Sequence, residues 1–430
     1  MTARTFRILL HHPAVRALVA ASGGTECHLV GGVLRDRALG LASHDVDAVV
    51  AGRGREIAEL LAAELPARLV LLGGKEFASY RLVGRDLTLD LWDRAGASLH
   101  DDLARRDFTV NAFALDARTG AVSDPFAGLE DLRRRLLRAT TAESFAGDPL
   151  RVLRLPRLLL RLPGFAADPQ TLLLARRSSP RLVEMAAERV RDELSYLFDH
   201  PEAHRGLAVL VALDVYPGLW LGRPGEPGRP GGAVAELEAL PERRRELRQL
   251  DASFADAVDL RAARLAATFA HLPARAGRGP LDFLELVRDA GYLTRSLAAD
   301  VALLLDLVEL PQDELGRRRF LHRAGRLWAT AAVSLGARTA EPDRWRAAVR
   351  PLVELARKEG AAILDPPRLL TGEEVQELLG VPAGPKIGKA LAAVRQAQVD
   401  GSVLTRDEAV ELITGRSPSS GPRSRPSGAG

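Results

Sequence analysis

Cysteine, lysine and aromatic residues are scarce in this chain of 430 residues. The single cysteine, Cys27, excludes an internal disulfide framework and a cysteine-rich zinc site, and it suits a reducing compartment. Only four of the 60 basic residues are lysine, so arginine carries almost all of the positive charge. Aromatic residues make up 5% of the chain, and we therefore expect cores built from Leu, Ala and Val.

Long apolar runs are also missing. Near the N-terminus, Arg4 and Arg7 are followed only by Ile8–Leu10 before His11, which is too short a core for a signal peptide. No stretch reaches the roughly 18 apolar residues that a membrane-spanning helix needs. We therefore expect a cytoplasmic protein without a membrane partner, while the sequence does not predict the oligomeric state.

The charge balance is nearly even, with 60 basic and 56 acidic residues and a net charge of +4. Arginine side chains suit phosphate groups and base edges, so a nucleic-acid partner is compatible with this composition. A genome rich in G and C would give the same Arg, Ala and Leu usage without such a partner. Composition alone leaves both interpretations open.

Residues 28–140 alternate short β-rich runs with helical stretches, which predicts a small α/β domain. Beyond Ala139 strand signals almost vanish, and Leu, Ala and Arg recur at helical spacing to about residue 415. The segment Pro224–Gly232 predicts a loop, and Gly415–Gly430 predicts a disordered tail. The expected strands are His28–Val30, Val46–Val50, Arg68–Leu72, Ser79–Val83 and Leu87–Trp92.

Two carboxylates begin the second of these strands. Asp45 and Asp47 are two residues apart, so in a strand both side chains point to one face. Like charges side by side are costly unless a cation lies between them, and Mg²⁺ prefers such oxygen ligands. A bland alternative remains open, in which Asp45 caps a turn and Asp47 is solvated at the strand end.

A glycine pair precedes these carboxylates. Gly31-Gly32 joins the strand His28–Val30 to a helix that starts with Val33. Such a turn lets phosphate approach the backbone and the N–H groups at a helix start. Most Gly-Gly turns are merely tight turns, so this signal is weak by itself.

These elements form part of an ordered series. The chain resembles the family of class II tRNA nucleotidyltransferases and bacterial poly(A) polymerases, whose head opens with Gly-Gly-X-Val-Arg-Asp followed by Asp-X-Asp. Leu34 replaces the usual valine. Two C-terminal segments, Leu369–Gly372 and Gly384–Gly388, are similar to the end of many bacterial members. Five elements match in order over about 170 residues: Gly31–Asp36 with Asp45–Asp47, Arg105–Ala112, Asp124–Gly128 with Asp131–Leu132, Gly147–Arg154, and Glu188–Leu194.

The resemblance implies an α+β protein, with a polymerase-β-like nucleotidyltransferase head followed by an all-α neck, body and tail. It implies transfer of CMP and AMP from CTP and ATP to the 3′ end of tRNA without a template, with release of pyrophosphate. Mg²⁺ held by the catalytic residues Asp45 and Asp47 is the implied cofactor. The implied domains are 1–140 (head), 141–200 (base-reading neck), 201–330 (body), 331–415 (tRNA-binding tail) and 416–430 (disordered).

The resemblance also implies a nucleotide-binding set. Asp148 and Arg151 would read the pairing edge of the base, and Arg154 and Arg157 would lie near the base or the phosphates. The triphosphate and sugar would be held by Gly32, Arg35 and Arg106.

Ordinary structural roles compete with these assignments. Asp148 followed by Pro149 is a good start for a helix, with the carboxylate as N-cap. The arginines could form solvated ion pairs of little energetic weight. Asp107 could either belong to the catalytic centre or orient Arg106, and Asp90 is a candidate third carboxylate on a neighbouring strand.

The chain departs from the family pattern in its neck. Gly147 stands where a glutamate normally precedes the aspartate, which we expect to loosen Arg151 or Arg154 and relax base selectivity. Pro156 falls inside the expected neck helix, where proline removes a hydrogen bond and costs roughly 3 kcal/mol unless compensated. We therefore expect a kink just before Arg157.

Two further departures concern activity. The segment from Asp93 to Arg105 is short, whereas members that complete the final A carry a longer flexible loop here; members that add only two cytidines lack it. His271 has no aspartate after it, so we expect no second, phosphohydrolase site. Addition of CC only, poly(A) synthesis, or RNA binding without catalysis therefore remain as alternative functions.

Overall fold

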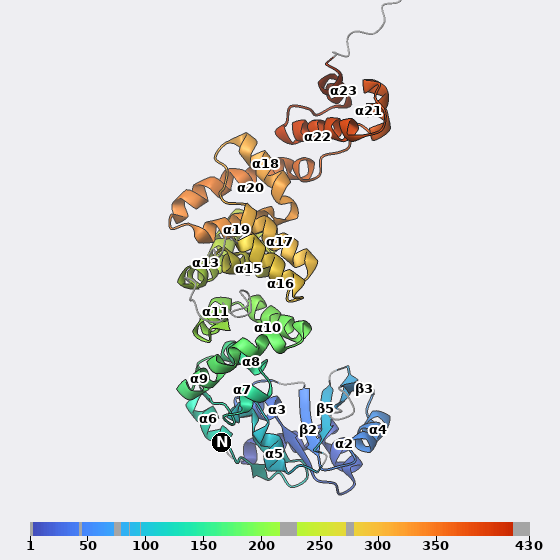
Figure 1. Cartoon of the computed structure of the whole chain (residues 1–430). Coiled ribbons are helices and arrows are strands. Elements are labelled where there is room, and N and C mark those ends of the chain that lie inside the picture. Colours follow the sequence, from blue (N-terminus) through green and yellow to red (C-terminus); the bar gives the residue numbers. More distant parts are fainter. Residues whose placement is uncertain are drawn as a thin grey trace, which may run out of the picture. The chain divides into compact units, whose positions relative to one another are not determined.

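The computed structural model describes residues 3–42, 45–72, 79–85, 87–94, 96–215, 230–271 and 279–415. Figure 1 follows the chain from the mixed α/β part to the helical part. The chain divides into two compact units, Met1–Pro227 with Ala290–Tyr292, and Gly228–Asp289 with Leu293–Gly430. The expected α+β class is confirmed, while the finer domain boundaries stay a prediction.

The first unit is built on a seven-stranded sheet with the order β3-β4-β5-β2-β1-β6-β7. Only the pair β2 and β5 is parallel. All five expected strands are present, whereas β6 and β7 were not expected, because strands this short show no alternation to detect. The strands are β1 (Cys27–Val30), β2 (Asp45–Val50), β3 (Ala67–Leu72), β4 (Ser79–Gly84), β5 (Thr88–Asp93), β6 (Ala114–Asp116) and β7 (Val122–Ser123).

Alternation along β2 separates its two faces. Val46, Ala48 and Val50 are buried on the face that α2 (Pro13–Ser22) and α4 (Gly54–Glu64) cover. Asp45, Asp47 and Val49 project to the other face. There Val49 packs with Leu103 of α5 (Leu99–Ala104), so apolar packing covers one end of this face. The carboxylate end stays open.

Helices complete the first unit, and two short strands, β8 (Leu136–Leu137) and β9 (Ala166–Ala167), pair in parallel between them. The helix α8 contacts α10 and α11, and so joins the sheet domain to the helices that follow it. The remaining helices are α1 (Ala3–Leu10), α3 (Gly32–Ala38), α6 (Gly128–Arg134), α7 (Ser144–Gly147), α8 (Arg151–Arg161), α9 (Pro169–Ser178), α10 (Ala187–Asp199) and α11 (Ala203–Ala212).

The start of α8 corrects one expectation. The sequence predicted a helix beginning at Pro149, but α8 begins at Arg151 with Leu150 as N-cap. Asp148 still contributes to this start, since its Oδ1 accepts from the Leu150 N–H at 3.3 Å. The helix continues through the buried Pro156 to Arg161, so proline does not end it.

Among its described residues the second unit has helices and no strands, as the sequence predicted. Here α13 begins at Pro230, inside the loop expected over Pro224–Gly232; residues 224–229 and the expected disordered tail 416–430 lie outside the described residues. Its helices are α13 (Pro230–Leu250), α14 (Ala252–Asp256), α15 (Leu260–Ala270), α16 (Pro280–Asp289), α17 (Arg295–Asp306), α18 (Glu314–Ala324), α19 (Trp328–Arg338), α20 (Pro342–Leu364), α21 (Gly372–Leu379), α22 (Pro385–Asp400) and α23 (Arg406–Thr414).

Apolar contacts and caps define the last three helices. Val375, Val394 and Ala409, one from each helix, belong to a single buried cluster. Thr371 and Thr405 start α21 and α23 with capping boxes, each closed by a glutamate three residues later. Across the described part of the chain, no helix combines the length and apolar character that crossing a membrane would require.

Candidate functional site

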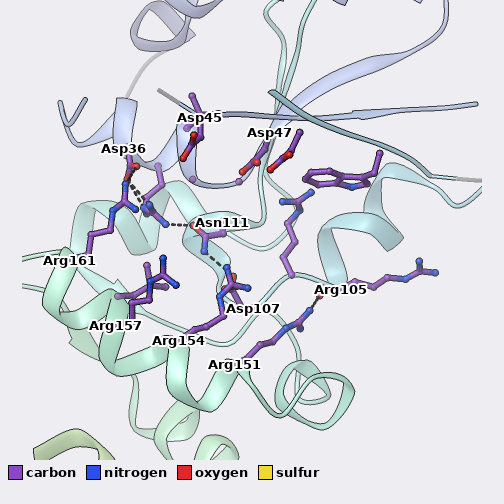
Figure 2. Close-up of a pocket in the computed structure, with 18 of the residues that line it drawn as sticks. Asp36, Asp45, Asp47, Arg105, Asp107, Asn111, Arg151, Arg154, Arg157 and Arg161 are labelled. Atoms are coloured by element: carbon purple, nitrogen blue, oxygen red, sulfur yellow. Dashed lines mark hydrogen bonds and ion pairs between the residues drawn. The ribbon is translucent and has the colours of Figure 1, made fainter. Parts of the chain in front are cut away.

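A polar cavity of about 670 Å³ lies on the open face of the sheet, within the first unit. Figure 2 shows Asp45 and Asp47 on one side of it and Arg154, Arg157 and Arg161 of α8 on the other. Sequence reasoning assigned nine residues to the site, and the structure brings eight of them to this cavity: Gly32, Arg35, Asp45, Asp47, Arg106, Arg151, Arg154 and Arg157.

Gly31 shapes the floor beside the carboxylates. It follows Val30, whose register partner on β2 is Asp47. Gly31 has φ 74° and ψ −144°, a conformation open essentially only to glycine, and a Cβ here would lie 2.6 Å from Asp47 Oδ2. The Gly32 N–H donates to the Asp47 carboxylate. The glycine turn therefore accommodates the carboxylate directly.

Asp47 sits in an environment with too little positive charge. Burial raises its pKa, Arg106 and the Gly32 N–H oppose this, and the neighbouring Asp90 and Asp45 add to it, so the pKa lies above the ordinary value. A divalent cation beside Asp47 would relieve this repulsion. The residues present thus fit a metal, although among the described residues no three His, Cys, Asp or Glu side chains converge as a ready ligand set.

Asp90 lies on β5, directly across from Asp47 in the parallel register. It also lines the cavity. Both its carboxylate oxygens are engaged by Arg81 of β4, with Nε to Oδ1 at 2.7 Å and Nη2 to Oδ2 at 2.8 Å. The candidate third carboxylate is therefore close to the pair, but it is held by an arginine.

A buried hydrogen-bond chain connects the sheet domain to α8. Arg35 donates to Asn111 Oδ1 at 2.8 Å, and the Asn111 amide donates to Asp107 Oδ1 at 2.9 Å. Asp107, only 4% exposed, forms an ion pair with Arg154 at 3.2 Å. Asp107 thus orients the α8 arginine and Asn111, and none of its recorded contacts is with Arg106. Asp107 also lines the cavity, so a part in the catalytic centre stays a prediction.

A second connection runs through Asp36. This carboxylate, 1% exposed, accepts from Arg35 Nε at 2.8 Å and from Arg161 Nη2 at 2.7 Å. In Figure 2 both connections appear as dashed lines below Asp45. Arg35 therefore contacts α8 by two routes. One runs through Asp36 to Arg161, and the other runs through Asn111 and Asp107 to Arg154, on an earlier turn of the helix.

Four arginines share the cavity face of α8. Arg151, Arg154, Arg157 and Arg161 follow each other at intervals of three, three and four residues, which is one face of a helix. Sequence reasoning named the first three and missed Arg161, although the same spacing would have identified it. This stripe presents its charge toward the cavity that the carboxylates line.

Arg157 is held firmly despite the proline before it. Its Nη1 donates to both oxygens of Glu193 at 3.0 and 3.1 Å, and its guanidinium lies 4.6 Å from the Tyr196 ring centre. Glu193 and Tyr196 both belong to α10. The position expected to be disturbed by Pro156 is thus fixed by a neighbouring helix.

Asp148 is the exception among the assigned residues, since it does not line the cavity. Its Oδ2 lies 3.4 Å from Arg189 of α10 and 4.0 Å from Arg151 Nε. Arg151 instead donates to the backbone carbonyls of Ser144 and Arg105. The missing glutamate at Gly147 therefore does not leave Arg151 without partners, contrary to our expectation.

Other cavity residues were missed by sequence reasoning. Asp36 and Asn111 lie inside matched motifs, so motif membership could have flagged both. Arg81, Trp92 and Asp102 carried no recognised signal.

In the second unit, His271 contacts Glu236 at 3.1 Å, and Arg338 donates to the same carboxylate at 2.9 Å. His271 and Arg338 thus both contact the buried Glu236 carboxylate.

Family models match segments of this chain, and known proteins match nearly all of it. Residues 27–138 match the Poly A polymerase head domain, and residues 164–220 match a model described as the probable RNA and SrmB-binding site of polymerase A. A CC-adding tRNA nucleotidyltransferase from Geobacter sulfurreducens is 30% identical over 93% of this chain and 94% of the relative. An A-adding tRNA nucleotidyltransferase from Deinococcus radiodurans is 34% identical over 90% and 94%.

The fold has solved counterparts. The CCA-adding enzyme of Bacillus stearothermophilus, crystallised in complex with CTP, superposes with a TM-score of 0.65 at 25% identity, over 96% of this chain and 98% of that one. With full-length relatives at 30% identity or more, this chain belongs to the tRNA nucleotidyltransferase family.

Proposed function

We propose that this protein adds nucleotides to the 3′ end of tRNA, transferring CMP from CTP and releasing pyrophosphate. The observation that carries the proposal is the cavity in which Asp45 and Asp47 of the sheet face the arginine stripe of α8. Carboxylates suit the reacting phosphate with its metal, and arginines suit a base edge and phosphate oxygens. Relatives named for CC addition and for A addition support nucleotide addition to tRNA, and the CC-adding relative supports CTP as the substrate.

The proposed cofactor is Mg²⁺, held by Asp45 and Asp47, in a family that generally uses a divalent metal. Bound there, the ion would lower the pKa of the attacking 3′-hydroxyl and neutralise charge on the leaving pyrophosphate. Gly31 gives the Asp47 carboxylate its space, and the Gly32 N–H orients it. The chain's own contribution is to hold this pair on one strand face before the substrates arrive.

Nucleotide recognition is proposed to divide between two groups. Arg35 and Arg106, from the sheet domain, would bind the triphosphate and sugar. Arg151, Arg154 and Arg157, from α8, would donate to the base edge and its surroundings. For Asp148 to read the base, its carboxylate would have to leave Arg189. The ion pair between the two is largely exposed, so breaking it costs little free energy.

The other parts of the chain are proposed to have separate roles. Residues 1–140 would be the catalytic head, 141–200 the base-reading neck, 201–330 the body, and 331–415 the part that binds tRNA through shape and phosphates. Lys386 and Lys389 of α22 are both exposed, and so can reach a phosphate backbone. These residues would add affinity without choosing the nucleotide.

A short connection favours a stop after two cytidines. Arg94, only 8% exposed, follows β5 and pairs with Glu26, and Ala97 N donates to its carbonyl. Ser98 then caps α5. Only three residues, positions 95 to 97, separate that arginine from Ser98, so the sequence lacks the long loop expected here of members that complete the final A.

A product ladder tests the proposal. Purified protein, Mg²⁺ and a tRNA that lacks its CCA end are given CTP alone, or CTP with ATP, and the products are separated at single-nucleotide resolution. We expect two added cytidines in both reactions; a third residue only with ATP would show CCA addition, and a long A tail would show a poly(A) polymerase. The double variant Asp45→Ala with Asp47→Ala should be inactive.

The control for that variant is Glu56→Ala, which removes an exposed carboxylate on α4 that pairs only with nearby Arg53 among its recorded contacts. It should keep wild-type activity, because such surface pairs contribute little. Full activity of the double variant would overturn the metal assignment. Tight tRNA binding by the wild type with no incorporation in any metal would instead support a non-catalytic RNA-binding protein.

A further inference from the structure

Trp92, which no motif singled out, stands beside the arginine proposed to bind the triphosphate. We propose that Trp92 is a positioning residue: its indole holds Asp102 and Arg106 so that the free donors of Arg106 face the triphosphate of the incoming nucleotide. This inference rests on the proposed function and adds a residue to it. The chemical group recognised is the triphosphate, whichever base is attached.

The strand geometry brings Trp92 to the cavity. It lies on β5 two residues after Asp90, so both side chains project to the same face of the sheet. Trp92 and Asp90 line the same cavity. Beneath, the indole packs against a buried cluster that includes Val49 and Leu103, which fixes the ring in place.

The indole makes two different contacts with one ion pair. Its Nε1–H donates to Asp102 Oδ1 at 3.2 Å, and the other oxygen of Asp102 accepts from Arg106 Nη2 at 3.0 Å. The Arg106 guanidinium carbon lies 5.2 Å from the centre of the Trp92 ring, within cation–π range. Arg106 is therefore held from one side by the carboxylate and from another by the ring.

The remaining donors of Arg106 are left for a ligand. Its Nη1 lies 3.2 Å from where a Cβ on Gly31 would stand, on the Asp47 side of the cavity. Its Nε also has no hydrogen-bond partner within the described residues, but this atom is buried, so the donors open to a ligand are those of the guanidinium end. The side chain is 14% exposed, and a partly desolvated guanidinium with open donors binds phosphate oxygens strongly.

Position separates this role from base reading. Arg106 Nη1 and Asp47 Oδ2 both lie within 3.2 Å of the point where a Cβ on Gly31 would stand, so Arg106 lies beside the proposed metal pair. The base-reading arginines come from α8. Loss of the Trp92 contacts should therefore weaken the binding of all nucleoside triphosphates equally. It should also weaken the binding of inorganic tripolyphosphate, which has no base.

The test compares Trp92→Phe and Trp92→Leu with the matched control Phe126→Leu. Phe126 packs against the same buried cluster but has no recorded contact with Arg106, so its truncation reproduces the loss of packing alone. For Trp92→Leu we expect KM for CTP and the dissociation constant of tripolyphosphate to rise about tenfold, with kcat within about twofold. For Trp92→Phe, which loses the N–H donor and part of the ring but keeps an aromatic face toward Arg106, we expect about threefold.

The outcomes separate the possibilities. Unchanged KM and tripolyphosphate binding in Trp92→Leu, or equal changes in Phe126→Leu, would reduce Trp92 to a core residue and overturn the inference. A loss for CTP without a loss for tripolyphosphate would also overturn it. Calorimetry measures tripolyphosphate binding without any nucleotide incorporation. An inactive wild type would therefore contradict the proposed function, while the role of Trp92 could still be measured.

Discussion

Gly31 and Asp47 are fitted to each other: a Cβ on Gly31 would stand 2.6 Å from Oδ2 of the aspartate. Gly31 directly follows Val30, the last residue of β1, which pairs with Asp47. The backbone conformation of Gly31 is open essentially only to glycine. The glycine pair that we expected as a phosphate-binding turn therefore also accommodates the carboxylate proposed to hold the metal. Any side chain at position 31 must displace it.

Gly31→Ala tests this fit. We expect at least a hundredfold loss of kcat, because the methyl group displaces the Asp47 carboxylate and the backbone strain costs about 1–3 kcal/mol. Incorporation kinetics and thermal melting measure the two effects. Gly147→Ala is the control, since a Cβ there meets nothing within 4 Å and φ is ordinary. If Gly31→Ala were as active as Gly147→Ala, the proposed constraint would be absent.

Asp90 should matter less than the Asp45 and Asp47 pair. Because Arg81 engages both its oxygens, Asp90→Asn removes a negative neighbour of Asp47 more than a ready ligand. We expect the Mg²⁺ concentration for half-maximal activity to rise about three- to tenfold, against complete loss for Asp47→Asn. Titration of activity with Mg²⁺ measures this. Complete loss in Asp90→Asn would make it a metal ligand in its own right.

Acid should weaken the link between Asp107 and α8. Burial tends to raise the pKa of Asp107, but Arg154, the Asn111 amide and the Phe108 N–H outweigh it and hold the pKa below its ordinary value of 3.8. A lowered folded pKa means that this stabilisation is complete above the unfolded pKa and is lost as pH falls through the folded value.

Asp107→Asn should therefore lower the free energy of unfolding at pH 7 by about 2 kcal/mol, the typical worth of a hydrogen bond to a charged group. The difference from wild type should shrink below about pH 4. Denaturant unfolding at pH 7, 5, 4 and 3 measures it, with the exposed Glu59→Gln as control. A difference that stays constant down to pH 3 would contradict the assigned ionisation.

Restoring the family's glutamate should change little. Arg151 already donates to two backbone carbonyls and Arg154 pairs with Asp107, so Gly147→Glu adds a carboxylate to arginines that have partners. We expect the ratio of kcat/KM for CTP to that for ATP to stay within about threefold. A tenfold or larger gain in selectivity would show that Gly147 relaxes base choice, as we expected from the sequence.

The sequence predicted the strands of the site because hydrophobic alternation and turn residues are local. The expected strand Val46–Val50 appears as β2, one residue longer, and the arginine spacing of α8 was legible in the chain. β6 escaped because three residues carry no periodic signal. The start of α8 was placed two residues early because Asp148 caps a preceding turn.

By itself the sequence determined the carboxylate pair, the arginine stripe and the family to which they belong, since these depend on residue type and spacing. Only the tertiary structure decided their partners. Asp90 lies opposite Asp47 but forms an ion pair with Arg81. Asp107 pairs with Arg154, and the Trp92 ring contacts Arg106. Such contacts join residues on different strands and helices, and strand register and helix packing, which local patterns do not encode, bring them together.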